Sequence, residues 1–198
     1  MTGADAETLG VYARDAARYA EIVADTDKDP VLKALLNTLP EQSRVLDLGC
    51  GPGHLAARLR DLGHEVTATD ASPEMAAQAK VLFDLDVTVA TFDDLDEVDT
   101  YDGVLASFSL LHAPKDRMPE HLATIRRALR PDGVLSIGLK MGEGAHRDTL
   151  GRFYAYYTDE EITGLLEAAG FTVISRSFGE GKGLDGKLAK SIVLGARA

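Results

Sequence analysis

The sequence contains a single cysteine and no long apolar run. One cysteine excludes a disulfide within the chain and fits a reducing compartment. A membrane-spanning helix needs about 18 or more apolar residues in succession, and no stretch of that kind occurs. Residues 1–7 lack the basic and apolar regions of a secretory signal peptide. The expected location is therefore cytoplasmic.

Basic residues are also scarce, with 21 Lys and Arg against 32 Asp and Glu and a formal net charge of −11 at pH 7. Nucleic acids are bound largely through Lys and Arg, so the balance opposes a polyanionic partner. The one adjacent basic pair, Arg126-Arg127, falls on the expected solvent face of an amphipathic helix.

No His, Cys, Asp and Glu residues have metal-ligand spacing, so no metal site is expected. A length of 198 residues with 45% hydrophobic content favours a single domain over 1–198.

The chain is organised around residues 45–53, with the sequence VLDLGCGPG. A short apolar run predicts a buried strand, and three glycines at alternate positions predict a tight turn before a helix. This is the nucleotide-binding corner of a doubly wound α/β sheet. The dinucleotide pattern G-x-G-x-x-G would need a glycine at position 54, which is His54. A nicotinamide dehydrogenase is therefore disfavoured.

Further strands are expected at 65–70, 86–90, 103–106 and 134–139, followed by a terminal hairpin of 171–175 and 191–195. The residues between the hairpin strands, 179–186, carry four glycines and predict a flexible loop. Helices are expected over 5–24 and from Leu32 to Leu39. Ser72 and Pro73 are typical of a helix N-cap and its first residue. Residues 140–157 are expected to form a loop near the carboxyl end of the sheet.

An ordered set of motifs resembles the class I S-adenosylmethionine (SAM)-dependent methyltransferases, in particular a small bacterial subgroup similar to methyltransferase types 11 and 12. The set comprises Asp47 with the three glycines, Asp70 after the second strand, and the segments Tyr101-Asp102-Gly103-Val104, Pro131-Asp132-Gly133 and Glu167-Ala168-Ala169-Gly170-Phe171. The resemblance implies a Rossmann-like, doubly wound, seven-stranded sheet of order 3-2-1-4-5-7-6 with the last strand antiparallel. It also implies a helical lid over 1–42 and a catalytic core over 43–198.

The implied cofactor is SAM, with S-adenosylhomocysteine (SAH) as product. Asp70 is placed to accept both ribose hydroxyls, since a carboxylate offers two acceptor oxygens. Many members of the family have an acidic residue at the position of Thr91, where it binds the adenine amino group. Asp93 can make this contact only if the register of the segment slips. Cys50 is expected as a small apolar filler. The cofactor-binding residues predicted in this way are Tyr19, Asp47, Gly49, Cys50, Gly51, Gly53, Asp70, Ala71, Met75, Thr91, Phe92, Asp93 and Ser107.

His112 is the predicted catalytic residue, because the loop after the fourth strand faces the sulfonium and histidine titrates near neutral pH. The alternative is a packing histidine. The candidate substrate-binding residues are Tyr12, His146, Arg147, Arg152, Tyr154 and Tyr156. The basic residues would suit a carboxylate or phosphate, and the tyrosines would stack on a ring. The alternatives are a structural lid whose charges pair with one another, and tyrosines that anchor a helix.

The predicted function is methyl transfer to a small-molecule acceptor by in-line displacement. A tRNA or nucleotide methyltransferase and a non-catalytic SAM-binding regulator remain alternatives. Membranes and nucleic acids are not expected partners, and the chain is expected to be a monomer or homodimer. The sequence does not identify the acceptor.

Overall fold

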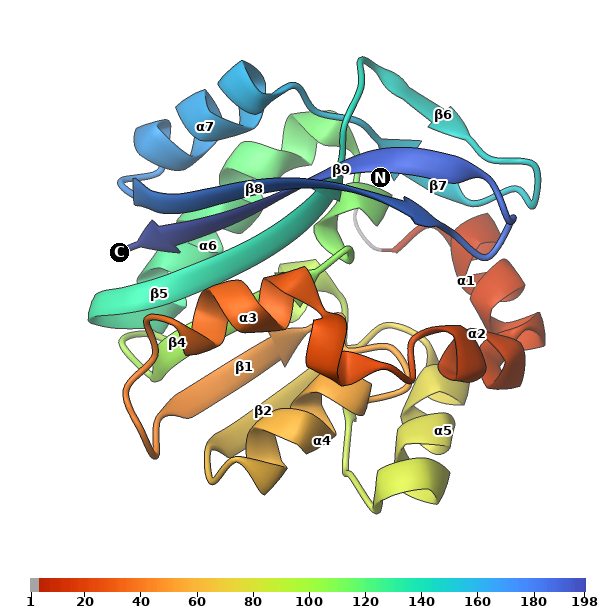
Figure 1. The fold of residues 1–198 in the computed structure, drawn as a ribbon, viewed down its shortest axis with the longest axis horizontal. Helices are drawn as coiled ribbons and strands as arrows, with labels where there is room; N and C mark the ends of the chain where they lie inside the picture. Colours follow the sequence, from red (N-terminus) through yellow and green to blue (C-terminus); the bar gives the residue numbers. More distant parts are fainter. Residues whose placement is uncertain (1–3) are drawn as a thin grey trace.

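The computed structural model describes residues 4–198, so residues 1–3 of the stretch compared with a signal peptide lie outside it. Its main feature is a seven-stranded sheet of order β3-β2-β1-β4-β5-β9-β8 (Figure 1). All neighbours are parallel except that β9 runs antiparallel to both β5 and β8. The strands are β1 (Arg44–Leu48), β2 (Glu65–Asp70), β3 (Thr88–Val89), β4 (Tyr101–Ser107), β5 (Leu129–Lys140), β8 (Thr172–Lys182) and β9 (Leu188–Arg197).

Numbered by their order within this sheet alone, the strands run 3-2-1-4-5-7-6, and the predicted α/β fold class is confirmed. The labels differ because a separate two-stranded sheet, β6 (Ala145–Arg147) and β7 (Phe153–Ala155), precedes the last two strands. This small sheet lies in the segment that was expected to be a loop. Strands of three residues are too short to show an alternating pattern, so the sequence gives no signal for them.

The helices are α1 (Ala6–Arg14), α2 (Ala16–Ile22), α3 (Pro30–Leu36), α4 (His54–Asp61), α5 (Pro73–Phe83), α6 (Met118–Ala128) and α7 (Asp159–Ala168). The single helix expected over 5–24 is wrong, because the backbone leaves the helical region at Asp15 (φ −107°, ψ 15°). The predicted cap of α5 is confirmed: Ser72 Oγ accepts the Met75 N–H at 3.2 Å, and Pro73 is the first helical residue. Within residues 4–198, no helix is both long and apolar enough to cross a bilayer.

Strand β5 shows how the sheet is covered on both faces. Leu135, Ile137 and Leu139 belong to a core cluster that includes residues of α6 and α7. On the other face, Val134 packs with residues of α3 and α4, and Ser136 Oγ donates to the carbonyl oxygen of Val31 at 2.7 Å. Alternate residues thus meet different helical layers, as expected for a strand buried on both faces.

The terminal hairpin differs from the expectation for 179–186. Strands β8 and β9 pair over almost their full length, and only residues 183–187 lie between them. The flexible loop predicted from the glycines is therefore wrong for residues 179–182. These residues pair with β9 through backbone groups, which glycine provides as well as any other residue.

Gly53 begins α4 in the left-handed region, with φ +82°. A Cβ there would lie 2.8 Å from Ala79 Cβ and 2.9 Å from Leu85 Cδ2, whereas Gly63 (φ +92°) has nothing within 4 Å. We expect Gly63→Ala to lower the free energy of unfolding by about 1 kcal/mol, from backbone strain alone. Gly53→Ala adds overpacking and should cost about 2–4 kcal/mol in all. Urea denaturation measures both, and equal losses would contradict the packing role.

Candidate functional site

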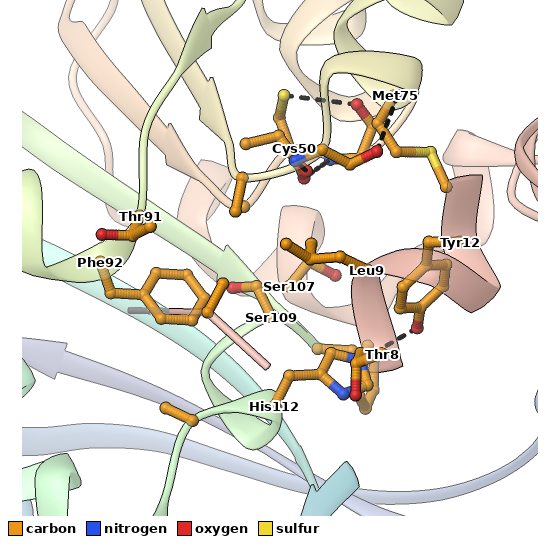
Figure 2. Close-up of a pocket in the computed structure, with 18 of the residues that line it drawn as sticks. Thr8, Leu9, Tyr12, Cys50, Met75, Thr91, Phe92, Ser107, Ser109 and His112 are labelled. Atoms are coloured by element: carbon orange, nitrogen blue, oxygen red, sulfur yellow. Dashed lines mark hydrogen bonds between the residues drawn. The ribbon is translucent and has the colours of Figure 1, made fainter. Parts of the chain in front are cut away.

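A cavity lies where β1, β2 and β4 end, beneath the N-terminal helices. Its wall includes Asp47 from β1, Asp70 from β2, Ser107 from β4, and Tyr12 and Tyr19 from the helices α1 and α2. Strands β2 and β4 lie on opposite sides of β1, so this is the switch point where ligands bind in doubly wound sheets. Figure 2 shows Thr91 and Phe92 across the cavity from Tyr12.

The glycine-rich turn brings two loops into contact. Gly49 has φ +75°, and a Cβ at this position would lie 2.4 Å from Ser109 Cβ. Ser109 Oγ donates to the carbonyl oxygen of Leu48 at 2.6 Å, which ties the loop after β4 to the end of β1. Only glycine fits between them, so bare backbone of Gly49 and Gly51 lines the cavity.

Asp47 is a buried carboxyl group without a compensating charge. Its side chain is 1% exposed, and within residues 4–198 its Oδ2 has no hydrogen-bond partner. Burial, together with the charges of Asp70 and Asp29, raises the pKa of this carboxyl to about 8. A buried oxygen left without a partner is costly. Because Asp47 lines the cavity, a cationic ligand group is the natural partner.

Asp70 joins the ends of β1 and β2. Its Oδ2 accepts the Gly51 N–H at 2.7 Å, and its Oδ1 accepts the Ser72 N–H at 2.8 Å. Burial raises the pKa of this carboxyl, while the two backbone donors lower it. Each carboxylate oxygen can accept a second hydrogen bond, so the two backbone contacts leave capacity for ribose hydroxyls.

The residues that the sequence predicts around the adenine can be placed in the structure. Phe92, Asp93, Ala71 and Met75 all line the cavity. Thr91 also lines it, but its N–H and Oγ1 both donate to Asp94 Oδ2, so this side chain serves a local cap.

Gly53 is the one predicted cofactor residue that the cavity wall does not include. The position that a Cβ of Gly53 would take faces Ala79 and Leu85, so packing accounts for this glycine, and its cofactor role stays a prediction. The remaining twelve predicted cofactor residues line the cavity: Tyr19, Asp47, Gly49, Cys50, Gly51, Asp70, Ala71, Met75, Thr91, Phe92, Asp93 and Ser107.

At the other end, a chain of hydrogen bonds connects Tyr12 and His112, both of which line the cavity (Figure 2). Tyr12 Oη lies 2.9 Å from His112 Nε2, and His112 Nδ1 lies 2.7 Å from the carbonyl oxygen of Phe153. The carbonyl can only accept, which assigns the proton to Nδ1 and makes Nε2 the acceptor from Tyr12. Arg152 donates to Tyr12 Oη at 3.0 Å. Burial lowers the pKa of His112 to about 4, so this imidazole is neutral at pH 7.

The basic residues predicted to bind substrate do not reach the cavity wall. Arg152 is 1% exposed and pairs with Asp148 at 2.7 Å, and Arg147 pairs with Asp5 at 2.8 Å. These side chains instead hold α1 against the β6–β7 sheet, together with the Phe153 N–H donated to Thr8 Oγ1. The alternative that the lid charges pair with one another is the one that the contacts support.

The aromatic candidates of β6 and β7 also lie outside the cavity wall. His146 stacks on Tyr156, with 4.4 Å between the ring centroids. Tyr154 lies against His112 at 4.6 Å and beneath Lys140, whose Nζ is 3.7 Å from the ring centroid. Only Tyr12 of the six predicted substrate residues faces the cavity.

Several residues that line the cavity are not predicted as site residues from the sequence, namely Thr8, Leu9, Asp29, Phe108, Pro114, Arg117 and His121. Asp29 carried a signal, since Asp before Pro predicts a helix cap, but that signal says nothing about a cavity. Among the described residues, the charged groups of the wall are five aspartates and one arginine, and Arg117 pairs with Asp93 at 2.8 Å. The wall therefore favours a cation.

Comparison with known proteins agrees with this geometry. A sequence model of the methyltransferase domain matches residues 45–133. An uncharacterized methyltransferase of Staphylococcus carnosus is 32% identical over 136 residues, which cover 67% of this chain and 64% of that protein. The malonyl-[acyl-carrier protein] O-methyltransferase of Enterobacter lignolyticus is 34% identical over 52% of this chain and 42% of its own length. The matched part of the chain thus spans less than two thirds of the length of these curated relatives.

A solved structure matches the whole chain. The 1,6-didemethyltoxoflavin-N1-methyltransferase of Burkholderia thailandensis, with bound 1,6-didemethyltoxoflavin and SAH, has a TM-score of 0.70 and 27% identity, covering 100% of this chain and 91% of that one. The fold, the glycine-rich turn and these matches define a class I SAM-dependent methyltransferase. The chain belongs to this family, whose cofactor is SAM.

The buried Asp47 carboxyl makes a prediction about stability and pH. Its pKa is higher in the folded chain than the ordinary 3.8, so the folded state holds the proton more tightly. Wild-type stability should therefore fall, through this group, as pH rises from about 4 to about 8. Asp47→Asn has no such proton to lose. Relative to wild type, we expect the free energy of unfolding of the variant to rise by about 1 kcal/mol per pH unit in that window. Urea denaturation at pH 5 to 8.5 measures the difference, and a constant difference would contradict the assignment.

Proposed function

We propose that this chain transfers the methyl group of SAM to a small-molecule acceptor. The observation that carries the proposal is the cavity itself, which joins a glycine-rich turn and buried carboxyl groups at one end to Tyr12 and His112 at the other. The whole-length relative from B. thailandensis, which holds a small acceptor together with SAH, supports this choice. We further propose that residues 1–42 act as the lid of one domain over 1–198. A cytoplasmic location and a monomeric or homodimeric state stay predictions.

The residues of the cofactor half fit SAM in chemistry. The unpartnered Asp47 oxygen suits a cationic group, and Asp70 keeps acceptor capacity for a diol. Phe92 and Met75 supply apolar surface for a flat ring. When bound, SAM supplies a sulfonium-activated methyl group, so the protein mainly orients the acceptor and excludes water.

The roof of the cavity favours a small acceptor over a macromolecule. Thr8, Leu9 and Tyr12 of α1 all contribute to the wall, and the helix is held there by the hydrogen bond that the Phe153 N–H of β7 donates to Thr8 Oγ1. The apolar side chains Leu9 and Phe108 line the cavity, and the described wall contains no lysine and no arginine other than Arg117. A tRNA would need cationic contacts that this wall does not offer.

The state of His112 narrows the acceptor chemistry. Proton transfer from a phenol of pKa about 10 to an imidazole of pKa about 4 costs about 8 kcal/mol. His112 is therefore a weak base before methyl transfer. A neutral nitrogen attacks through its lone pair and becomes acidic only afterwards, when Tyr12 Oη can take its proton and pass its own to His112 Nε2. We propose a nitrogen acceptor of this kind.

Titration by calorimetry tests the cofactor assignment. Purified protein should bind SAH with micromolar affinity and show no heat with NAD. Asp70→Asn should weaken SAH binding about tenfold or more, because a charged acceptor for the ribose is lost. Binding of NAD in place of SAH would overturn the proposal. Binding of SAH without methyl transfer from labelled SAM to any small acceptor would favour a SAM-binding regulator.

The acceptor chemistry is tested with His112→Asn. The starting probe is 1,6-didemethyltoxoflavin, extended to other heteroaromatic amines, with labelled SAM. For a nitrogen acceptor we expect kcat to fall less than about tenfold, because the imidazole takes no proton in the methyl-transfer step. A general base acting in that step would be worth about 10²–10⁴ in rate. A fall of that size, with SAH affinity unchanged, would contradict the proposal.

A further inference from the structure

Asp29 caps α3 and also lines the cavity whose wall includes the buried Asp47. Its Oδ1 accepts the N–H groups of both Val31 and Leu32, at 2.9 Å and 2.8 Å. Within residues 4–198, no hydrogen bond or ion pair engages its Oδ2. Capping therefore uses one oxygen of this carboxylate and leaves the other available.

Asp29 and Asp47 act on the same region of the cavity, although they come from different layers. The charge of Asp29 raises the pKa of Asp47, and together with the charge of Asp70 it also raises that of Tyr19. The titratable groups lining this end are Asp29 at the N-cap of α3, Tyr19 from α2, Asp47 from β1, Cys50 from the glycine-rich turn, His54 from α4 and Asp70 from β2. None of them is a lysine or arginine.

Oδ2 of Asp47 is a fully buried acceptor that has no hydrogen-bond donor within residues 4–198. Because Asp47 lines the cavity, this oxygen is available to a donor group of a bound ligand. We propose that Asp29 is a further cofactor-binding residue, which forms with Asp47 a pair of carboxylates that receives the protonated amino group of the methionyl part of SAM. This inference rests on the proposed function. Asp29 lies outside the glycine-rich turn and belongs to the segment between α2 and the sheet.

A capping role alone does not require an aspartate here. Asparagine and serine cap helices about as well as aspartate and carry no charge. Burial raises the pKa of Asp29, so its charge is held at a cost in the absence of a ligand. An ammonium group between Asp29 and Asp47 offsets that cost for both carboxylates. Cofactor binding then also stabilises the position of α3, whose N-terminus Asp29 fixes.

The test compares two ligands on matched variants by calorimetry. SAH carries the amino acid part, whereas 5′-methylthioadenosine has the same nucleoside and thioether without it. Asp29→Asn keeps the capping oxygen and removes the charge. We expect this variant to bind SAH about tenfold or more weakly and to bind 5′-methylthioadenosine within about twofold of wild type. Asp70→Asn is the control, since the loss of a ribose contact should weaken both ligands.

Each other outcome overturns the inference. Unchanged SAH affinity in Asp29→Asn would show that the carboxylate does not meet the amino group. Equal weakening of both ligands would show that Asp29 acts only through the structure of α3. If Asp29→Asn failed to fold by circular dichroism, Asp29→Ser would take its place with the same expectation. If wild-type protein bound 5′-methylthioadenosine but not SAH, the two-carboxylate site would be wrong, and if it bound neither, the proposed function would fail as well.

Discussion

The carboxyl group of Asp47 is buried at the end of β1 without a positively charged partner, and the rest of the site depends on this constraint. A lone buried carboxylate is unfavourable, so burial raises the pKa of Asp47. The packing of the surrounding core must offset the free-energy cost of placing this group there. The glycine-rich turn makes the placement possible, because Gly49 lets the loop after β4 approach within contact distance. The same close approach leaves backbone, rather than side chains, on the cavity wall.

The roof of the cavity depends on a second buried charge, which is fully compensated. Arg152 is 1% exposed, pairs with Asp148 and donates to Tyr12, so it holds α1 through the same tyrosine that meets His112. Removing one partner of a buried pair typically costs about 3–5 kcal/mol, whereas exposed pairs such as Arg147–Asp5 contribute little. The position of the lid and the chemistry of the acceptor end are therefore coupled through Tyr12. A displaced α1 would leave His112 without its hydrogen-bond donor.

The sequence predicts the floor of this site better than its roof, for a physical reason. The turn at Gly49, the acid at Asp70 and the cap at Ser72 are local patterns, since each depends on residues a few positions apart. The partners of Arg152 are Asp148, which is close in sequence, and Tyr12, which lies 140 positions away. No pattern of residue spacing in the sequence indicates a contact between positions so far apart. Gly53 shows the converse case, because the motif predicts a ligand contact for it, whereas the structure shows that its missing side chain leaves room for Ala79 and Leu85.

The two ends of the cavity differ in what they can recognise. The cofactor end concentrates aspartates and selects a ligand by charge, an interaction that acts over several ångströms and is strengthened by burial. A neutral imidazole and a phenol lie at the end proposed for the acceptor, and the apolar side chains Leu9 and Phe108 also line the cavity. Shape and apolar contact must then distinguish one acceptor from another, and these discriminate weakly, by about 1–3 kcal/mol per methylene group. Under the proposed function, the choice of acceptor therefore depends on α1, which lies outside the residues 45–133 that the methyltransferase model matches, and on the loop after β4, which lies within them.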